Sequence, residues 1–281
     1  MERELTLATL SLSACGSALL LSSSLLPSAQ SGGGGQELEH ACARRMWSPL
    51  VFALLVFAGL LGWGLQEPDM TNEALSPVVW GVALVVSAIW GRAALRAVLS
   101  VAAATSRPAT GACTIGLLRP RVVVVESLAS LLDESELGAV LEHERAHVRH
   151  RDPLRILLTQ FVADLQWPVP SAGTLLSAWR HALELARDEE ARARGVDGAD
   201  LASAIVKAAR FAVGRRATAA ALVDAPQLAD RVARLLQPVP TSRGPWTFRR
   251  LSVVLASSLA VAVIVGHIFG EQIVRAVAGV D

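Results

Sequence analysis

Residues 143–147 read His-Glu-Arg-Ala-His, so two of the chain's six histidines flank a glutamate at a spacing of four. On a helix, His143 and His147 lie one turn apart on one face, where both imidazoles can bind the same zinc ion. Glu144 lies beside them and can hold a water molecule. The spacing therefore predicts half of a zinc peptidase site, with two histidine ligands and Glu144 as general base.

A third ligand is expected on a second helix, predicted over about residues 176–194. His181, Glu184 and Asp188 share one face of that helix, because they lie three and four positions apart. A zinc peptidase uses three protein ligands and leaves one coordination position for water. We expect Glu184 to be the third ligand and Asp188 to accept a hydrogen bond from a ligand histidine. Asp188 itself and Glu189 are competing ligands, and a solvated charged helix is the alternative.

The helix that carries the histidines is predicted to begin after Asp133 and to end before Pro153. Asp133 followed by Glu136 forms a capping-box pattern, and proline does not continue a helix. Upstream, residues 115–118 and 122–125 predict two short strands. These strands form either a structural hairpin or an edge that holds an extended substrate.

The remaining histidines and helical segments are expected to have structural roles outside the metal site. His150 lacks the following residues of a metzincin motif, so we expect it on the surface at a helix end. Residues 154–176 contain polar residues and prolines. We expect a helix that lies on or dips into the membrane, or is buried in the domain, rather than a fifth span. Residues 224–236 predict a final amphipathic helix, and His267 is expected near a membrane interface.

The chain is 52% hydrophobic and 18% charged, and its apolar residues are clustered. Four stretches approach the roughly 20 apolar residues that cross a bilayer, namely residues 5–26, 47–65, 76–95 and 251–270. The third should continue as helix to about residue 104. We therefore expect a mainly α polytopic membrane protein with four transmembrane helices. Its parts are three spans within residues 1–104, a cytoplasmic α+β zinc-peptidase (zincin-like) domain in residues 105–249, and a fourth span with a short outer tail in residues 250–281.

The placement of arginines predicts the orientation of these spans. Basic residues lie before the second span, after the third and before the fourth, whereas residues 66–75 contain acidic residues and no basic one. The histidines should therefore face the cytoplasm, in a multi-pass protein of the cell membrane. An alternative is that residues 1–30 are a cleaved signal peptide, but the Glu2-Arg3-Glu4 start is not the expected positive one.

Composition limits the other functions. The net charge of +1 gives no sign of a nucleic-acid surface. Cys15, Cys42 and Cys113 are too few and too scattered for a disulfide framework, so we expect free thiols. Residues 31–36 contain four glycines and predict a flexible linker.

Three blocks in this order resemble the BlaR/MecR-type family of integral membrane zinc metallopeptidases, the antirepressor family. Residues 116–123 are similar to the strand block of that family. Residues 141–153 resemble its His-Glu-x-x-His-x-x-x-x-Asp-Pro block, and residues 184–189 its Glu-Leu-x-x-Asp-Glu block. The expected layout of three spans, a zinc domain and a fourth span is also similar.

The resemblance implies that His143, His147 and Glu184 bind one zinc ion and that Glu144 is the general base. It also implies regulated cleavage of a cytoplasmic protein, such as a BlaI-type winged-helix transcriptional repressor. Antibiotic-sensing members continue beyond the fourth span into a penicillin-binding domain, and this sequence ends at Asp281. We therefore expect no β-lactam sensing by that route.

The chain also differs from the family in the residues that could stabilise the oxyanion formed during peptide hydrolysis. The chain contains no tyrosine. Stabilisation of the oxyanion or contact with the substrate would then depend on His181, Arg187 or Arg231.

Two other functions remain open. One is a membrane quality-control protease similar to HtpX, which shares the histidine motif and the Glu-x-x-x-Asp arrangement. The other is a membrane receptor or scaffold that does not cleave. The Arg-Asp-Pro sequence after the histidines and the four-span layout favour the antirepressor family, and the intact Glu144 and Glu184 favour catalysis.

Overall fold

The computed structural model describes residues 2–25, 33–66, 76–105, 111–215 and 225–238. The expected fourth span at residues 251–270, with His267, lies outside the described residues. So do residues 27–29, near the end of the alternative signal peptide.

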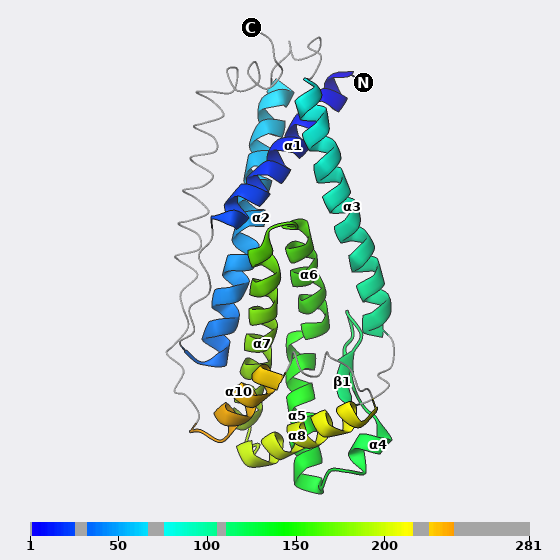
Figure 1. The fold of residues 1–281 in the computed structure, drawn as a ribbon, viewed down its shortest axis with the longest axis vertical. Coiled ribbons are helices and arrows are strands. Elements are labelled where there is room, and N and C mark those ends of the chain that lie inside the picture. Colours follow the sequence, from blue (N-terminus) through cyan, green and yellow to red (C-terminus); the bar gives the residue numbers. More distant parts are fainter. Residues whose placement is uncertain (1, 26–32, 67–75, 106–110, 216–224, 239–281) are drawn as a thin grey trace.

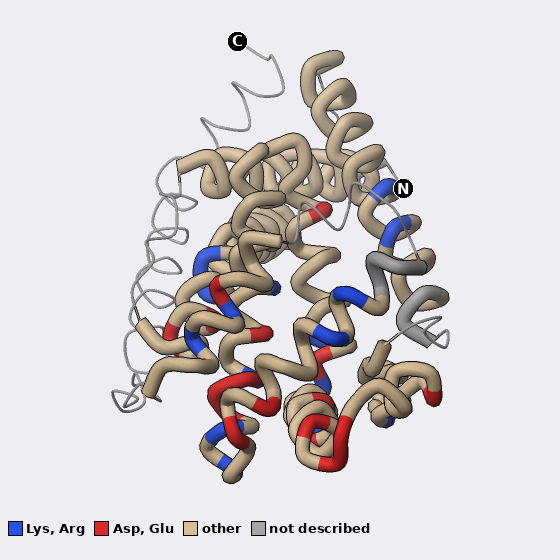
Figure 2. Tube along the Cα trace, turned by 60° about the horizontal axis from the view of Figure 1, so that its bottom comes forward, with Lys and Arg blue, Asp and Glu red and all other residues tan. Residues whose placement is uncertain are grey.

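Three long apolar helices form one end of the molecule: α1 (Glu2–Ser24), α2 (Gly35–Gln66) and α3 (Pro77–Thr105) (Figure 1). Each is long and apolar enough to cross a membrane. Acidic and basic residues are concentrated on the other elements, at the opposite end (Figure 2). The first three expected spans therefore coincide with helices of suitable length, and the expected continuation of the third helix to about residue 104 is confirmed.

Helix α2 differs from the prediction because it begins at Gly35 rather than near residue 47. Gly35 and Gln36, expected in a linker, are helical, and so are Arg44 and Arg45, expected in a loop. A helix of 32 residues is about 48 Å long, whereas the hydrocarbon core of a bilayer is about 30 Å thick. Helix α2 is therefore long enough to cross a bilayer while its charged first third projects beyond it.

Helices α6 (Asp152–Leu165) and α7 (Pro170–Ala193) form a hairpin that reaches in among the long helices (Figure 1). At its tip, Leu165 packs in one core with residues of α1, α2 and α3. Further along the hairpin, Val162 and Trp179 pack against Met46 of α2. Since α7 turns back beside α6, residues 154–176 do not form a single crossing. Helix α7 also begins earlier than the predicted residue 176.

The remaining elements form the end that holds the histidines. Strands β1 (Ala112–Ile115) and β2 (Arg121–Val124) pair antiparallel, which confirms the hairpin. The first strand was wrongly predicted at residues 115–118, because Gly116 adopts a left-handed backbone (φ +95°) and already begins the turn. Four helices complete this end: α4 (Glu126–Ala129), α5 (Glu134–His150), α8 (Gly198–Arg215) and α10 (Ala225–Leu235).

Helix α5 begins after Asp133 as predicted, but it ends at His150, slightly before the end expected near Asp152 and Pro153. The Asp133 carboxylate accepts from the backbone N–H of Glu136, and the Glu136 carboxylate accepts from that of Asp133. At the other end, Arg151 is left-handed (φ 52°, ψ 43°), and α6 begins at the next residue with Pro153 in its first turn. The chain therefore turns sharply between the two helices, which directs Asp152 back towards α5.

Candidate metal centre

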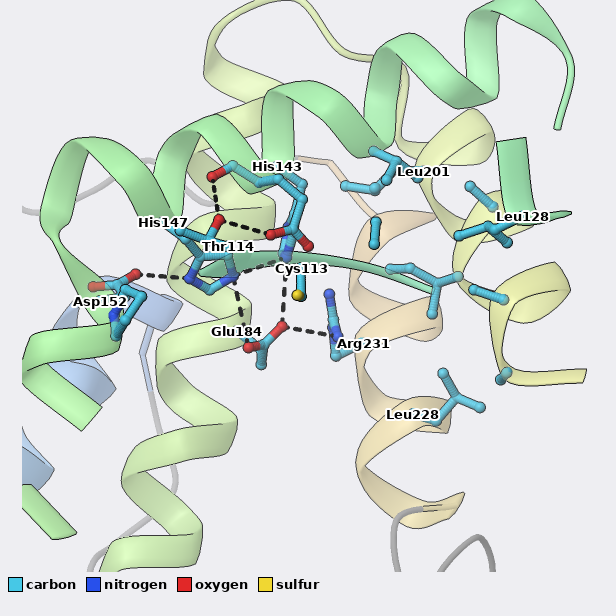
Figure 3. A pocket seen from close by; sticks show the side chains of 18 of the residues that line it. Cys113, Thr114, Leu128, His143, His147, Asp152, Glu184, Leu201, Leu228 and Arg231 are labelled. Carbon is cyan, nitrogen blue, oxygen red and sulfur yellow. Dashed lines mark hydrogen bonds and ion pairs between the residues drawn. The ribbon is translucent and has the colours of Figure 1, made fainter. Parts of the chain in front are cut away.

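The two histidines of α5 and one carboxylate of α7 converge on a common point (Figure 3). The Nε2 atoms of His143 and His147 lie 3.1 Å apart. Glu184 lies 3.5 Å from the first and 3.7 Å from the second of these nitrogens. The three ligand atoms all lie within 4.8 Å of one another, so the group could hold one metal ion. Two imidazoles and a carboxylate form a donor set that suits zinc in a catalytic site.

Behind His143 lies an acid–base pair from α7 and α10. Its Nδ1 atom lies 2.9 Å from Asp188, so Nε2 is left facing Glu184. Arg231 donates to both oxygens of Asp188, each at 2.9 Å. Although burial lowers the pKa of His143, the carboxylates of Asp188 and Glu184 raise it to about 10. For Glu184 the directions are reversed. Burial raises the pKa of this carboxyl group, but Arg231 and the histidines lower it more, so the carboxylate is ionised.

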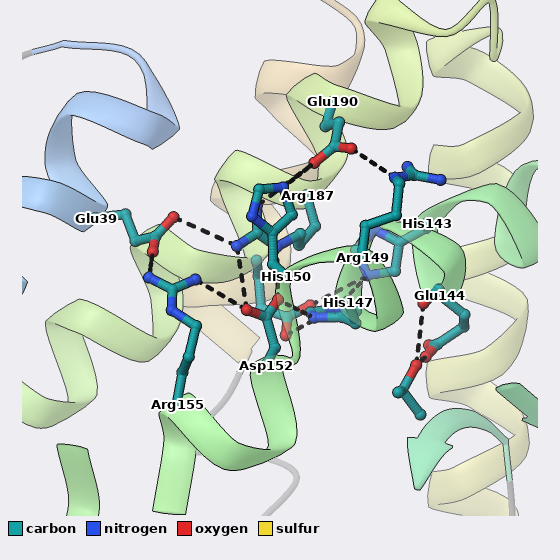
Figure 4. Close-up of polar contacts among 12 residues, drawn as sticks. Glu39, His143, Glu144, His147, Arg149, His150, Asp152, Arg155, Arg187 and Glu190 are labelled. Atoms are coloured by element: carbon teal, nitrogen blue, oxygen red, sulfur yellow. Dashed lines mark hydrogen bonds and ion pairs between the residues drawn. The ribbon is translucent and has the colours of Figure 1, made fainter. Parts of the chain in front are cut away.

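Behind His147 lies a second acid–base cluster (Figure 4). The Nδ1–H of His147 donates to Asp152 at 2.8 Å. Arg187 donates to both oxygens of Asp152, at 2.5 and 3.1 Å, and Arg155 adds a third bond of 2.9 Å. Burial raises the pKa of Asp152, but His147 and Arg187 lower it more, so Asp152 remains an anion. An anionic acceptor at Nδ1 fixes the tautomer that leaves Nε2 free to bind a metal.

Glu144 lies on the other side of the histidines, towards β1. The hydroxyl of Thr114 lies 2.9 Å from its carboxylate and 3.0 Å from its backbone oxygen. Both residues line a cavity of about 450 Å³ together with the three potential ligands. Its far wall is apolar and is formed largely by α8, through Leu201, Ala204, Ile205, Ala208 and Ala209. The cavity therefore places potential metal ligands, a carboxylate and space for a substrate side chain together.

The structure distinguishes the competing ligands by their position. Asp188 lies behind His143, against the nitrogen that faces away from Glu184. Glu189 accepts from the backbone N–H of Gly35 in α2, at 2.6 Å. His150 is the last residue of α5 and pairs with Glu190 at 2.8 Å. Among these carboxylates, only Glu184 belongs to the metal-binding group found in the described part of the chain.

The three residues considered for the oxyanion have different surroundings. Arg231 lines the cavity, with Nη1 3.0 Å from Glu184. His181 pairs with Asp230 of α10 at 2.8 Å. Arg187 is buried behind the histidines against Asp152. Neither of these last two residues belongs to the lining of the cavity in the described structure.

Sequence reasoning missed several residues around the site. Asp152 appeared only within a family block, although it lies five positions after His147 and precedes a proline, a position just past the helix end. No sequence pattern indicated Thr114 or Arg155 as residues of the site, because their partners depend on how β1 and α6 pack against α5. The Glu39 carboxylate, which contacts Arg155, is 116 positions distant in the sequence.

Comparison with known proteins identifies the family. No curated protein and no solved structure matches the chain. The model of one family, described as BlaR1 peptidase M56, matches residues 95–235, which is half of the chain. The matched region runs from α3 to the end of α10 and so includes the histidines, Glu184 and the clusters behind them. The chain therefore belongs to the BlaR1 peptidase M56 family.

Proposed function

We propose that this protein is a membrane-embedded, zinc-dependent endopeptidase that cleaves a cytoplasmic protein. The observation that carries the proposal is the convergence of His143, His147 and Glu184 in one cavity with Glu144. Membership of a metallopeptidase family and the three apolar helices are consistent with it. We further propose that the substrate is a BlaI-like transcriptional repressor, so that cleavage controls gene expression.

His143, His147 and Glu184 would hold the zinc ion, each ligand in an orientation already set by its neighbours. A bound zinc ion supplies Lewis-acid polarisation of the scissile carbonyl and lowers the pKa of water. Glu144 accepts a proton from the attacking water and returns it to the leaving amine. Thr114 holds the Glu144 carboxylate through its hydroxyl. Of the three residues considered for the oxyanion, Arg231 is the one that lines the cavity, so it is our choice to stabilise the developing negative charge.

The proposed orientation follows from the arrangement of the helices. The cavity is lined by residues of β1, α5, α7, α8 and α10. Apart from the upper part of α7, these elements lie at the end of the molecule opposite the apolar helices, where the charged residues are concentrated (Figures 1 and 2). Arg44 and Arg45 lie in the polar first third of α2, before its apolar stretch, and Arg92 and Arg96 follow the apolar stretch of α3 and pair with Asp164 of α6. All four therefore lie on the side of the apolar stretches that leads to the site. By the positive-inside rule this end faces the cytoplasm, where a soluble repressor would be accessible.

The test is co-expression of the full-length protein with a candidate repressor, in wild type and in Glu144→Gln. We expect zinc in both proteins and cleavage only in the wild type, because the substitution removes the base and keeps the ligands. Glu134→Gln, an exposed glutamate in the first turn of α5, is the matched control and should cleave normally. Cleavage that persists in Glu144→Gln would show that Glu144 is not the general base. A protein that degrades misfolded membrane proteins but spares every repressor would instead be a quality-control protease.

A further inference from the structure

Glu39 is a buried carboxylate on α2, in the part of that helix that precedes the apolar stretch. It is only 3% exposed. Its Oε1 atom contacts the guanidinium of Arg155, and its Oε2 atom lies 3.6 Å from Arg187 (Figure 4). A buried glutamate is rare unless it is paired, and Glu39 is paired with two arginines.

Both of these arginines also bind Asp152, the residue that holds the potential zinc ligand His147. Two parallel links therefore connect a membrane helix to a histidine of the metal site. Each link passes from Glu39 through one arginine to Asp152. Loss of the Glu39 charge would leave two cations facing Asp152 in a buried region, and the arginines would have to move or recruit other partners.

The start of α2 is fixed against α7 by a second, independent contact. The backbone N–H groups of Gly35 and Gln36 donate to Glu189, at 2.6 and 3.4 Å. Gly35 lies so close to α7 that a Cβ atom there would come within 2.5 Å of the Ala186 nitrogen. This close packing sets the position of Glu39, one turn further along α2.

We propose that Glu39 is a positioning residue for the zinc ligand His147, and that through it the placement of α2 controls zinc affinity. This proposal rests on the proposed zinc-peptidase function. In it, α2 is a continuous helix from the membrane span to the cluster behind the metal site. A displacement of α2 that withdraws Glu39 loosens Asp152, and His147 then loses its fixed tautomer and orientation.

The test measures zinc affinity by chelator competition in full-length protein that carries Glu144→Gln, so that self-cleavage cannot interfere. We expect Glu39→Gln to weaken zinc binding about 10-fold, the effect usual for groups that orient metal ligands. Glu37→Gln, two residues away on the same helix and partly exposed, is the matched control and should leave the affinity unchanged.

A double-mutant cycle separates positioning from general stability. If Glu39 acts through Asp152, then Glu39→Gln has no further effect on zinc affinity in an Asp152→Asn background. Additive losses would overturn the proposal, since they would mean that Glu39 acts elsewhere. If Glu39→Gln reduces the helical circular dichroism signal, Arg155→Gln replaces it in the cycle, because it cuts one of the two links between Glu39 and Asp152.

The role of the helix position is tested without any change of charge. Gly35→Ala must shift α2 away from α7, so it should weaken zinc binding several-fold, with no additional effect in a Glu39→Gln background. Gly59→Ala, at a glycine with open space around its Cβ position, is the control. Unchanged affinity in both Glu39→Gln and Gly35→Ala would contradict this inference alone. Absence of zinc from the Glu144→Gln parent would contradict the proposed function itself.

Discussion

The two histidines of α5 are held by similar chemistry from different parts of the molecule. Behind His143, Asp188 and Arg231 come from α7 and α10, and both belong to the peptidase half of the chain. Behind His147, Asp152 is bound by arginines of α6 and α7 that also contact Glu39 of α2. One histidine is therefore oriented within the peptidase half, and the other through a helix that is long enough to span a membrane.

Burial also differs between the two clusters. Behind His147, the side chain of Arg187 is 2% exposed and that of Arg155 is 32% exposed, whereas the side chain of Arg231 behind His143 is 16% exposed. The difference that matters is the complete burial of Arg187. Charge pairs in the interior are costly to break, because the remaining partner has no water to replace the lost one. The cluster behind His147 should therefore contribute more to the stability of the fold, and the cluster behind His143 more to the protonation of its ligand.

The largest effect is expected from His147→Ala, because zinc binding and cleavage would both depend on this proposed ligand. Zinc content and cleavage of the co-expressed repressor should both fall below detection. Metal analysis of the purified protein and a cleavage assay measure this result. His150→Ala, three residues further on and exposed, should retain both. Retained zinc in His147→Ala would exclude this residue as a ligand.

The next effect distinguishes the two clusters. Asp152→Asn and Asp188→Asn should each weaken zinc binding 10- to 100-fold, because each removes the anion that orients a histidine. In metal-free protein in nanodiscs, Asp152→Asn should lose about 3 kcal/mol of stability, since it leaves the buried Arg187 with only its longer contacts, at 3.6 Å, to Glu39 and Glu190. Asp188→Asn should lose about 1–2 kcal/mol. Chemical unfolding measures both values, and equal losses would mean that the difference in burial has no energetic consequence.

A third prediction concerns protons. Despite burial, the carboxylates of Asp188 and Glu184 raise the pKa of His143 to about 10, so this imidazole is charged at pH 7 unless a metal replaces its proton. Zinc binding at pH 7 should release about one proton from it, and zinc affinity should rise with pH. The raised pKa stabilises the metal-free fold fully below pH 6.5, and this stabilisation is lost as the pH rises through about 10.

Calorimetry in buffers with different ionisation enthalpies measures that proton release. Asp188→Asn removes an anion that raises the pKa of His143, so it should reduce the number of protons released. If the variant and the wild type release the same number, Asp188 does not control the charge of its histidine.

The smallest effect is expected on the substrate side of the histidines. Thr114→Val keeps the shape of the side chain but removes the hydroxyl that contacts Glu144. Cleavage should slow about 10-fold, as for the loss of a hydrogen bond to a charged group, with unchanged zinc affinity. A change in zinc affinity would show that Thr114 helps to orient the zinc ligands rather than the general base Glu144.

Local signals in the sequence predicted helix α5 correctly. Asp133 and Glu136 form the capping box, and the helix ends before Pro153, because capping and termination depend on neighbours along the chain. The spacing also placed His143 and His147 on one helix face, and the need for a third ligand together with the family block pointed to Glu184, which the structure brings beside them. The start of α2 was missed because hydropathy marks the apolar part of a helix and not its polar extension.

Contacts between distant segments could not be predicted. Asp152 meets His147 because Arg151 adopts a left-handed conformation, which no residue type in the segment required. Glu39 meets Arg155 only because α2 packs against the hairpin of α6 and α7, which brings together residues 116 positions apart. The residues proposed as ligands could therefore be selected from the sequence, whereas the groups that orient them depend on tertiary packing.

X-ray absorption at the zinc edge of the purified full-length protein tests the central claim most directly. The proposed site predicts nitrogen and oxygen neighbours at about 2.0–2.2 Å, including the multiple-scattering signature of two imidazoles. Cys113 lines the same cavity, so a sulfur ligand is the competing arrangement. A sulfur neighbour at about 2.3 Å, or folded protein without zinc, would contradict the assignment of His143, His147 and Glu184 as the metal ligands.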